Sequence, residues 1–306
     1  MGASTRPTHH RRQTSRTLLP CLAAILIFAS GEAQATPSKM DETSAITAAP
    51  PPPTGDETTA ISSVEPGQEG LELSARFSSS GEAIAKDVSW TVHNANGAVV
   101  FEDITAIAKM NLSPGNYRIE ASYGTAHIEE GVNLPEGINL GLNLVLNAGG
   151  LRLLPRIEGS LPVEVASVSR VFALSGSQAG KVVATSRIPG EILKLSAGDY
   201  RVESRFEQGN AIAVTEVHIK PGIMSAVEIN HHAGLAHFGF TKDTSAAVTW
   251  DVTREGGEAL PEFSGLDGDM VLKPGHYQAI AHFGANVSTV NFTIEPGQSR
   301  DVIVGN

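Results

Sequence analysis

Apolar and polar residues alternate in short runs along the chain from Gly70 onward, and turn residues separate the runs. The first run, from Gly70 to Phe77, places Leu71, Leu73 and Ala75 on one side and polar residues on the other. A period of two is typical of a strand with one buried face, and Gly, Pro and Asn between such runs mark tight turns. The pattern predicts an all-β fold built from many short strands.

The same order of strands and turns occurs three times. Each copy opens on a glycine before an alternating strand, at Gly70-Leu71, Gly150-Leu151 and Gly234-Leu235. A second strand follows, and its three versions are Val88-Ser89-Trp90-Thr91-Val92, Val168-Ser169-Arg170-Val171-Phe172 and Val248-Thr249-Trp250-Asp251-Val252. In this alignment Arg170 replaces the two tryptophans in the second copy, which suggests that this copy packs differently.

An L-x-x-G-x-Y motif is the strongest match between the copies. It aligns without a gap at Leu112–Tyr117, Leu195–Tyr200 and Leu272–Tyr277, so the tyrosines lie 83 and 77 residues apart. Self-similarity at this spacing indicates whole modules in tandem. We therefore expect three Ig-like or transthyretin-like β-sandwich modules, at residues 69–149, 150–233 and 234–306. An aromatic residue follows each motif tyrosine by six positions, at Tyr123, Phe206 and Phe283.

The motif tyrosines are expected to be structural. A Tyr just after a tight turn can pack its ring in the core and return its hydroxyl to the turn backbone. The alternative is a row of exposed aromatic rings that binds sugar or peptide. Alternation with Ile119 and Val202 favours burial, and Trp90 and Trp250 are expected in the core as well.

The first 68 residues are predicted to lie outside these modules. Residues 1–35 have four Arg, then an apolar stretch and Ala33-Gln34-Ala35, a pattern typical of a secretory signal peptide; the alternative is a short retained anchor. Residues 36–68 contain four consecutive prolines with many Ser, Thr and acidic residues, which predicts a disordered linker. Cys21, the only cysteine, lies in the signal, so no disulfide is expected in the mature chain.

The charge of the chain disfavours nucleic acid as a partner. The formal net charge is −11, and removing the four Arg and the one Glu of the first 35 residues leaves −14. Such a surface repels phosphate at low salt. We also expect no stable membrane insertion once the signal is cleaved.

Candidate reaction chemistry is sparse. His231, His232 and His237 form the tightest histidine group, but the adjacent His231 and His232 should point to opposite faces of an extended segment. Solvated junction histidines are therefore favoured over a metal site. Asp267-Gly268-Asp269 hints at calcium, but a turn fits better because no further oxygen ligands follow. We find no G-x-S-x-G or H-E-x-x-H motif, and predict no catalytic, cofactor-binding or metal-binding residue and no cofactor.

The repeated L-x-P-G-x-Y with a following Pro-Gly turn resembles carboxypeptidase-regulatory-like (prealbumin-like) and Cna-B-like sandwich modules. The Ala-Gly-Leu junctions and the Val-Ser-Trp-x-Val strand resemble tandem repeats of exported alphaproteobacterial proteins, some of which also carry a von Willebrand factor type A domain. The D-x-S-x-S signature of type A domains does not occur here, so no adhesion site is carried over. The resemblance implies fold far more than function.

Signal, linker and closely joined modules together predict a non-enzymatic protein of the bacterial cell envelope, periplasmic or secreted. We expect a semi-rigid, rod-like scaffold or protein-binding module with an envelope protein or glycan as partner. The alternative is an adhesin-like protein that binds carbohydrate or peptide through exposed sheet edges or loops. A metal-dependent enzyme is a third and weaker hypothesis.

Overall fold

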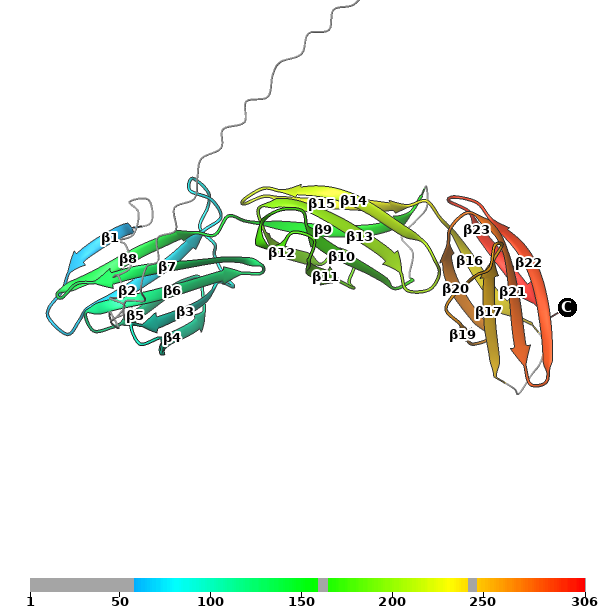
Figure 1. Cartoon of the computed structure of the whole chain (residues 1–306), viewed down its shortest axis with the longest axis horizontal. Helices are drawn as coiled ribbons and strands as arrows, with labels where there is room; N and C mark the ends of the chain where they lie inside the picture. Colours follow the sequence, from blue (N-terminus) through cyan, green and yellow to red (C-terminus); the bar gives the residue numbers. More distant parts are fainter. Residues whose placement is uncertain (1–57, 159–164, 242–246, 306) are drawn as a thin grey trace, which may run out of the picture. The chain divides into compact units, whose positions relative to one another are not determined.

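A computed structural model describes residues 58–158, 165–241 and 247–305. The proposed signal peptide, most of the proposed linker and Cys21 lie outside these segments, so the predictions about them stay predictions. In the described segments nearly all of the regular secondary structure is β-strand, as the alternating pattern indicated, and the strands form several sheets (Figure 1).

Module 1 consists of eight strands in two sheets (Figure 1). One sheet has the order β1-β8-β2-β5 and the other the order β4-β3-β6-β7. The strands are β1 (Thr58–Ser63), β2 (Gly70–Arg76), β3 (Ser89–Asn94), β4 (Val99–Ile104), β5 (Ile107–Asn111), β6 (Gly115–Tyr123), β7 (Ala126–Leu134) and β8 (Ile138–Val145).

Module 2 has a sheet of order β12-β9-β15 and a sheet of order β11-β10-β13-β14. A short 3-10 helix, Gly176–Gln178, lies between β10 and β11. The strands are β9 (Ala148–Ile157), β10 (Ser167–Ala173), β11 (Val182–Ser186), β12 (Ile192–Ser196), β13 (Gly198–Phe206), β14 (Ile212–Ile219) and β15 (Met224–His231).

Module 3 repeats this arrangement with sheets of order β20-β16-β23 and β18-β17-β21-β22, where β19 also pairs with β17. Its strands are β16 (Gly234–Phe240), β17 (Val248–Arg254), β18 (Glu258–Ala259), β19 (Phe263–Ser264), β20 (Asp267–Leu272), β21 (Gly275–Phe283), β22 (Asn286–Ile294) and β23 (Ser299–Val304).

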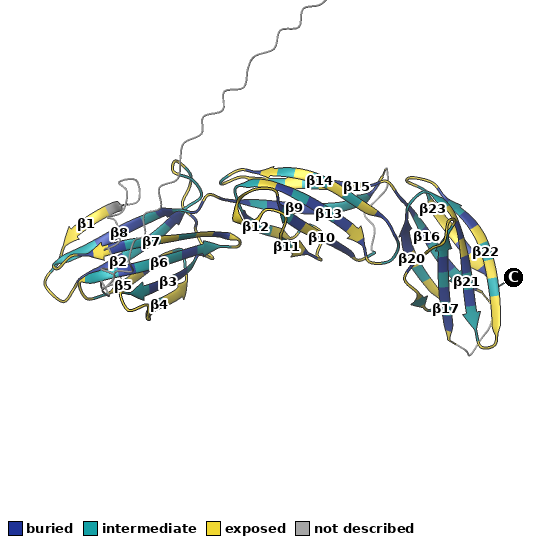
Figure 2. Ribbon diagram, in the orientation of Figure 1, coloured by how far each residue is buried: buried dark blue, intermediate teal, exposed yellow. Residues whose placement is uncertain are grey.

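The three modules share one topology. In each, one strand (β2, β9 or β16) runs parallel to the last strand of the module and antiparallel to the strand that leads into the tyrosine motif (β5, β12 or β20). The second sheet is an antiparallel hairpin series that contains the motif tyrosine. Alternate residues of both sheets point inward, so a buried band runs between the sheets of each module (Figure 2).

Trp90 and Trp250 occupy the centres of modules 1 and 3, and both side chains are fully buried, as predicted. Their indole N–H groups donate to the carbonyls of Thr105 and Gly265 at 3.0 Å. A buried indole needs such a partner because an unpaired donor in a dry core is costly.

The sequence alignment of the second strand is shifted by one residue in module 2. Trp90 pairs with Ala121 and Trp250 with Ala281, whereas the residue of β10 at the corresponding register is Ser169, opposite Ser204. Arg170 therefore does not replace a tryptophan; it lies exposed on the outer face. Ser169 Oγ donates to Ser204 Oγ at 3.1 Å, and both serines are buried.

The opening glycines are misaligned in the same way. Gly149 pairs with Leu195, and Gly234 pairs with Leu272, the first residues of their tyrosine motifs. Gly149 and Gly234 are therefore equivalent. Glu69, whose carbonyl accepts from Leu112 N–H, takes that position in module 1. The sequence alignment had equated Gly234 with Gly150.

A strand lies inside the segment predicted to be a disordered linker. Thr58–Ser63 forms β1 and pairs antiparallel with β8 from Ser63–Ile138 to Thr58–Leu142. It covers the outer edge of the β8 sheet. The same edges of β15 and β23 carry no strand partner among the described residues. The module boundaries proposed from sequence otherwise remain a prediction, with β9 beginning at Ala148 and β16 at Gly234.

Candidate functional site

The three motif tyrosines form the turn-locking contact expected from the sequence. Their hydroxyls donate to the carbonyl four residues earlier, at 2.7 Å for Tyr117, 2.8 Å for Tyr200 and 2.7 Å for Tyr277. All three rings are buried, and burial raises the pKa of Tyr200 and Tyr277. These residues stabilise the fold, and the three motif tyrosines do not form an exposed aromatic row.

Module 1 contacts module 2 through the turn between β6 and β7. Thr125 N–H donates to the Lys194 carbonyl at 3.1 Å, and Ser196 N–H donates to Thr125 Oγ1 at 3.2 Å. A Cβ on Gly124 would overlap the Lys194 carbonyl, so only glycine allows this approach. Lys194 Nζ also lies 2.9 Å from Asp87 Oδ2 and 4.5 Å from the centre of the Tyr123 ring.

Module 2 contacts module 3 through the equivalent turn between β13 and β14. Asn210 N–H donates to the Val271 carbonyl at 3.2 Å, and Val271 N–H donates to the Gln208 carbonyl at 3.0 Å. A Cβ on Gly209 would overlap the Val271 carbonyl. The turn therefore adds to the edge of β20 as a short parallel bridge between Gly209 and Val271.

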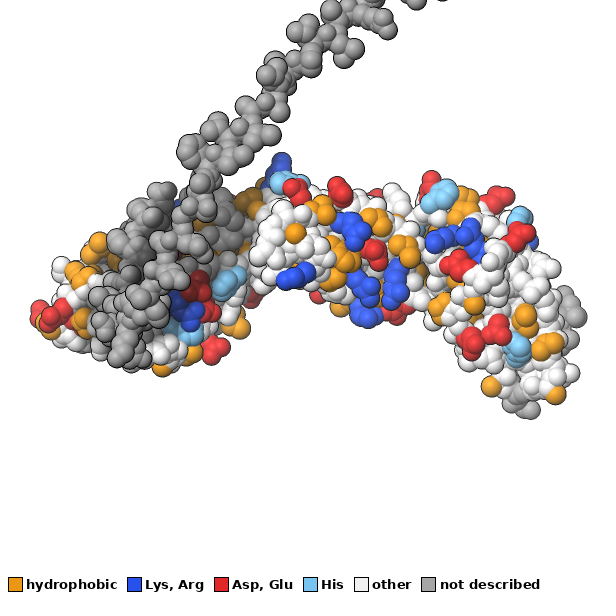
Figure 3. All heavy atoms as spheres, in the orientation of Figure 1, with side chains coloured by type: hydrophobic (Ala, Val, Ile, Leu, Met, Phe, Trp, Pro, Cys, Tyr) orange, Lys and Arg blue, Asp and Glu red, His pale blue; other side chains and the backbone are white. Residues whose placement is uncertain are grey.

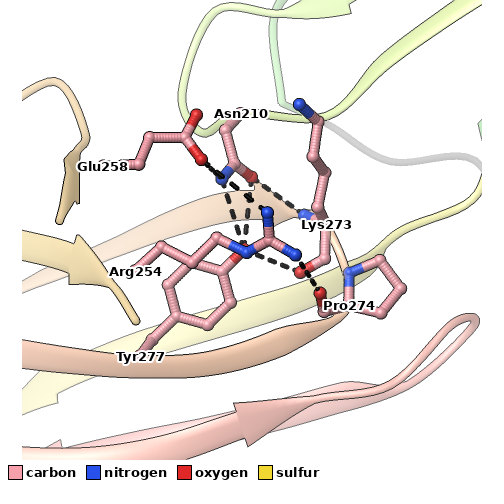
Figure 4. Close-up of polar contacts among 6 residues, drawn as sticks. All are labelled: Asn210, Arg254, Glu258, Lys273, Pro274 and Tyr277. Carbon is pink, nitrogen blue, oxygen red and sulfur yellow. Dashed lines mark hydrogen bonds and ion pairs between the residues drawn. The ribbon is translucent and has the colours of Figure 1, made fainter. Parts of the chain in front are cut away.

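Asn210 is the centre of a polar cluster at this second junction (Figure 4). Its Oδ1 accepts from Lys273 N–H at 2.9 Å, and its amide donates to Tyr277 Oη and to Glu258 Oε2, both at 3.3 Å. Arg254 Nη2 donates to the Pro274 carbonyl at 2.7 Å beside it. The lock tyrosine of module 3 is thus hydrogen-bonded to a side chain of module 2.

Apolar side chains also meet at the second junction. Val271 is fully buried in one cluster with Phe206, Ala211, Ala233 and Ile157. Burying a valine side chain stabilises by roughly 1.5–3 kcal/mol. Phe206 is the aromatic residue that the sequence placed six positions after the motif tyrosine, and the structure gives it a role at the junction.

The two junctions are built alike, and sequence reasoning missed both. In each, a glycine turn approaches the edge strand of the following module, and the next side chain accepts a backbone N–H from that module. The equivalent residues are Gly124 and Gly209, Thr125 and Asn210, Lys194 and Val271, and Ser196 and Lys273. A glycine soon after the repeated aromatic residue was the available signal.

His231 lies at the end of β15 and is completely buried, which corrects the expectation of solvated junction histidines. Its ring packs 4.7 Å from the Phe206 ring, and its nitrogens face the carbonyls of Ser204, Arg156 and Ile229 at 3.0–3.2 Å. Burial lowers the pKa of His231 because the cation is poorly solvated there. His232 points the other way, is exposed, and contacts Glu158 at 2.6 Å.

Ser299, His237 and Asp269 form a hydrogen-bonded chain on the outer face of the β20-β16-β23 sheet. His237 Nε2 lies 2.8 Å from Ser299 Oγ, and His237 Nδ1 lies 2.7 Å from Asp269 Oδ1. These atoms have the order of a serine-hydrolase triad. The sequence showed no motif for it because the three residues lie on three separate strands.

The surroundings of Ser299, His237 and Asp269 differ from those of a hydrolase active site, which is an enclosed cleft. His237 and Asp269 stand on an open sheet face, with side chains 39% and 46% exposed. The matching position in module 1 holds a Glu72–Lys109 ion pair at 3.0 Å. A cross-strand polar pair therefore occurs at this register in both modules, where it stabilises the pairing of the two strands.

No metal site forms in the described segments: no group of three or more His, Cys, Asp or Glu side chains there could hold an ion. Asp267 and Asp269 both lie in β20 instead of a calcium loop, which corrects the expected turn. Within residues 58–158, 165–241 and 247–305, no helix has the length and apolar composition to cross a bilayer.

Charged side chains gather over module 2 in the view of Figure 3, with acidic groups beside the basic ones. On the outer face Arg170 lies opposite Glu203, and the Arg201 guanidinium stands 4.6 Å from the Phe172 ring. Module 3 has an open depression of about 590 Å³ lined by residues that include Arg254, His276 and Arg300. These surfaces can take polar partners, and their mixed charge favours no particular one.

Two segments of the chain match a known repeat family. The model of the Rhizobiales growth-associated tandem repeat domain matches residues 76–150 and 242–305. These segments cover most of modules 1 and 3, which have the buried tryptophan. The matched segments leave out most of module 2, where Ser169 stands at the tryptophan position. Modules 1 and 3 are thus similar to a tandem repeat described from Rhizobiales.

No curated protein matches the chain. Among solved structures it is similar to the Bacillus anthracis TIE protein, with 17% identity, a TM-score of 0.26, and coverage of 78% of this chain and 50% of that one. A streptococcal ancillary pilin has 12% identity and a TM-score of 0.27, with coverage of 78% of this chain and 98% of that one. The minor pilin of Streptococcus agalactiae has 14% identity and a TM-score of 0.28, with coverage of 53% of this chain and 95% of that one. The chain spans about half the length of the Bacillus anthracis TIE protein.

Proposed function

We propose that this chain is a non-enzymatic exported protein of the bacterial cell envelope that acts as a multi-module scaffold and binds a protein partner. The recurring junction is the observation that carries this proposal. Two successive module pairs are joined by the same turn-to-edge hydrogen bonds, so the array is held as a unit and resists free swivelling of its members. A semi-rigid array suits a protein that spaces or presents partners.

The match to the repeat family supports a location for this proposed scaffold. The matched repeat is described as growth-associated in Rhizobiales, and we place this chain at the growing envelope, in the periplasm or at the cell surface. The N-terminal signal-like pattern supports export. The partner on this proposal is an envelope protein.

The test is in-cell photo-crosslinking from exposed positions of each module, followed by identification of the captured proteins and by imaging of a tagged chain. Crosslinks to one envelope protein, together with signal at growth zones, support the proposal. The matched controls are Gly124→Ala and Gly209→Ala, which disturb one junction each and should reduce partner capture without unfolding the modules.

A glycan array addresses the adhesin-like alternative, which rests on the open edges of β15 and β23 and on the depression in module 3. Specific glycan binding without a protein partner would favour that alternative. Labelling of the chain by a fluorophosphonate, lost in Ser299→Ala, would overturn the non-enzymatic proposal, since only an activated serine reacts.

A further inference from the structure

The two internal junctions define a donor and an acceptor surface. The donor is the glycine turn that follows the repeated aromatic residue. The acceptor is the edge strand before the tyrosine motif in the next module, which receives the turn at Lys194 in β12 and at Val271 in β20. In the described chain this leaves an acceptor in module 1 and a donor in module 3 that the two junctions do not use.

The acceptor of module 1 is the edge strand β5, whose one strand partner among the described residues is β2. Register with the first strand of each module makes Asn111 equivalent to Lys194 and Val271. Leu112 N–H donates inward to Glu69, so alternation points the N–H and C=O of Asn111 outward. An open depression of about 350 Å³, lined by residues that include Asn111 and Ser113, lies at this place.

The donor of module 3 is the turn between Phe283 and Asn286. It has the same two-residue length as the donor of module 1, because Phe283 pairs with Asn286 as Tyr123 pairs with Ala126. Gly284 has a φ of +60°, close to the +64° of Gly124. Gly284 and Ala285 are both exposed.

We propose that the Gly284-Ala285 turn of one copy of this chain docks on β5 of a second copy, through the contact that joins the modules within the chain. Ala285 N–H then donates to the Asn111 carbonyl, as Thr125 N–H donates to Lys194. The two surfaces are different, so the contact is heterologous and adds copies head to tail, in an open array or a ring. This inference goes beyond the proposed scaffold role and does not depend on it.

The contact between copies lacks a hydrogen bond that both internal junctions have. Thr125 and Asn210 accept a backbone N–H through their side chains, whereas Ala285 at the equivalent position has no side-chain acceptor. Because the contact joins separate copies, association depends on the concentration of the protein. Restoring the acceptor with Ala285→Thr is expected to tighten self-association about fivefold, the effect of one net hydrogen bond.

Disulfide trapping tests the contact directly, because the only native cysteine is Cys21. In a Cys21→Ser background, Ser113→Cys with Ala285→Cys should give a ladder of crosslinked oligomers under mild oxidation. Thr125→Cys with Ser196→Cys is the matched positive control, and it should close within one chain. Ala98→Cys with Ala285→Cys, two exposed positions that do not meet in the proposal, should give no crosslinked oligomers.

Sedimentation velocity over a concentration series gives the second readout. The full chain should show reversible growth in sedimentation coefficient, shifted to lower concentration by Ala285→Thr. Absence of a ladder from Ser113→Cys with Ala285→Cys, while the internal control pair closes, overturns the proposal. So does a sedimentation coefficient that stays constant for both the wild-type chain and Ala285→Thr.

Discussion

The hydroxyls of Tyr117 and Tyr277 both donate to a turn carbonyl of their own module, but only Tyr277 also contacts a residue of another module. Comparing the two therefore separates the stabilisation of one module from the coupling between modules. Replacing Tyr117 by Phe removes one bond to an exposed turn, and we expect a loss of about 1 kcal/mol in the stability of module 1. Tyr277→Phe also removes a partner of the nearly buried Asn210 amide, so we expect about 2 kcal/mol. Hydrogen exchange resolved by module is the measurement.

The Tyr277→Phe variant should additionally raise exchange at the Asn210 turn in module 2, while Tyr117→Phe leaves that turn unchanged. Equal effects of the two substitutions confined to their own modules would show that the Asn210–Tyr277 contact does not couple the modules.

His231 predicts a pH dependence for module 2. Burial lowers its folded-state pKa below the ordinary 6.5, so the unfolded chain binds a proton that the folded chain rejects. The sign follows directly: the stability of module 2 is fully present above about pH 6.5 and declines as pH falls from there toward the folded pKa. Thermal unfolding between pH 8 and 5 should show module 2 losing stability first.

His231→Phe should flatten this slope, because Phe keeps the ring beside Phe206 and cannot be protonated. The exposed His232 gives the control, since His232→Ala should leave the slope in place. A slope that persists in His231→Phe would assign the pH dependence to other groups.

At the scale of elements, the turn glycines decide whether modules join. Gly124→Ala should loosen the first junction, because the methyl group would overlap the Lys194 carbonyl. Gly97→Ala is matched to it: Gly97 has a φ of +78°, and a Cβ there meets nothing within 4 Å. Both variants carry about 1–2 kcal/mol of left-handed backbone strain, but only Gly124→Ala should expose the contact between the Thr125 turn and β12 to exchange and protease.

The strands and the lock were predictable from sequence, while the junctions were not. Alternation at Leu71, Leu73 and Ala75 gives a buried face directly, and the gapless motif identifies Tyr117 and its repeats. Register is harder, because a shift of one residue keeps the letters similar and reverses the face. That is why Arg170 was aligned with Trp90 although Ser169 stands there.

The contacts at the two junctions could not be predicted from the sequence because they join residues that are distant along the chain. Thr125 meets Ser196 and Asn210 meets Tyr277 across 71 and 67 positions. Their chemistry is ordinary turn chemistry until the edge strand of the next module is placed beside it. Ser299, His237 and Asp269 likewise come together through strand register alone.

At the scale of the whole molecule, the two junctions should respond differently to salt. Lys194 holds the first junction in part through Asp87 and the face of Tyr123, and the Lys194 ammonium lowers the pKa of Asp87. The second junction buries Val271 in an apolar cluster. Salt screens exposed charge pairs, whereas it leaves apolar burial unchanged or strengthens it. Raising the salt concentration should therefore loosen the first junction alone.

Hydrogen exchange at the two donor turns, in low salt and in about 1 M salt where the Debye length falls to about 3 Å, tests this asymmetry. Exchange at Thr125 should rise with salt, and exchange at Asn210 should stay constant. Lys194→Met keeps much of the packing over Tyr123 and removes the charge, so Thr125 in that variant should exchange faster at low salt and lose its salt response. Equal salt responses at both turns would mean that the charged contact contributes little to joining modules 1 and 2.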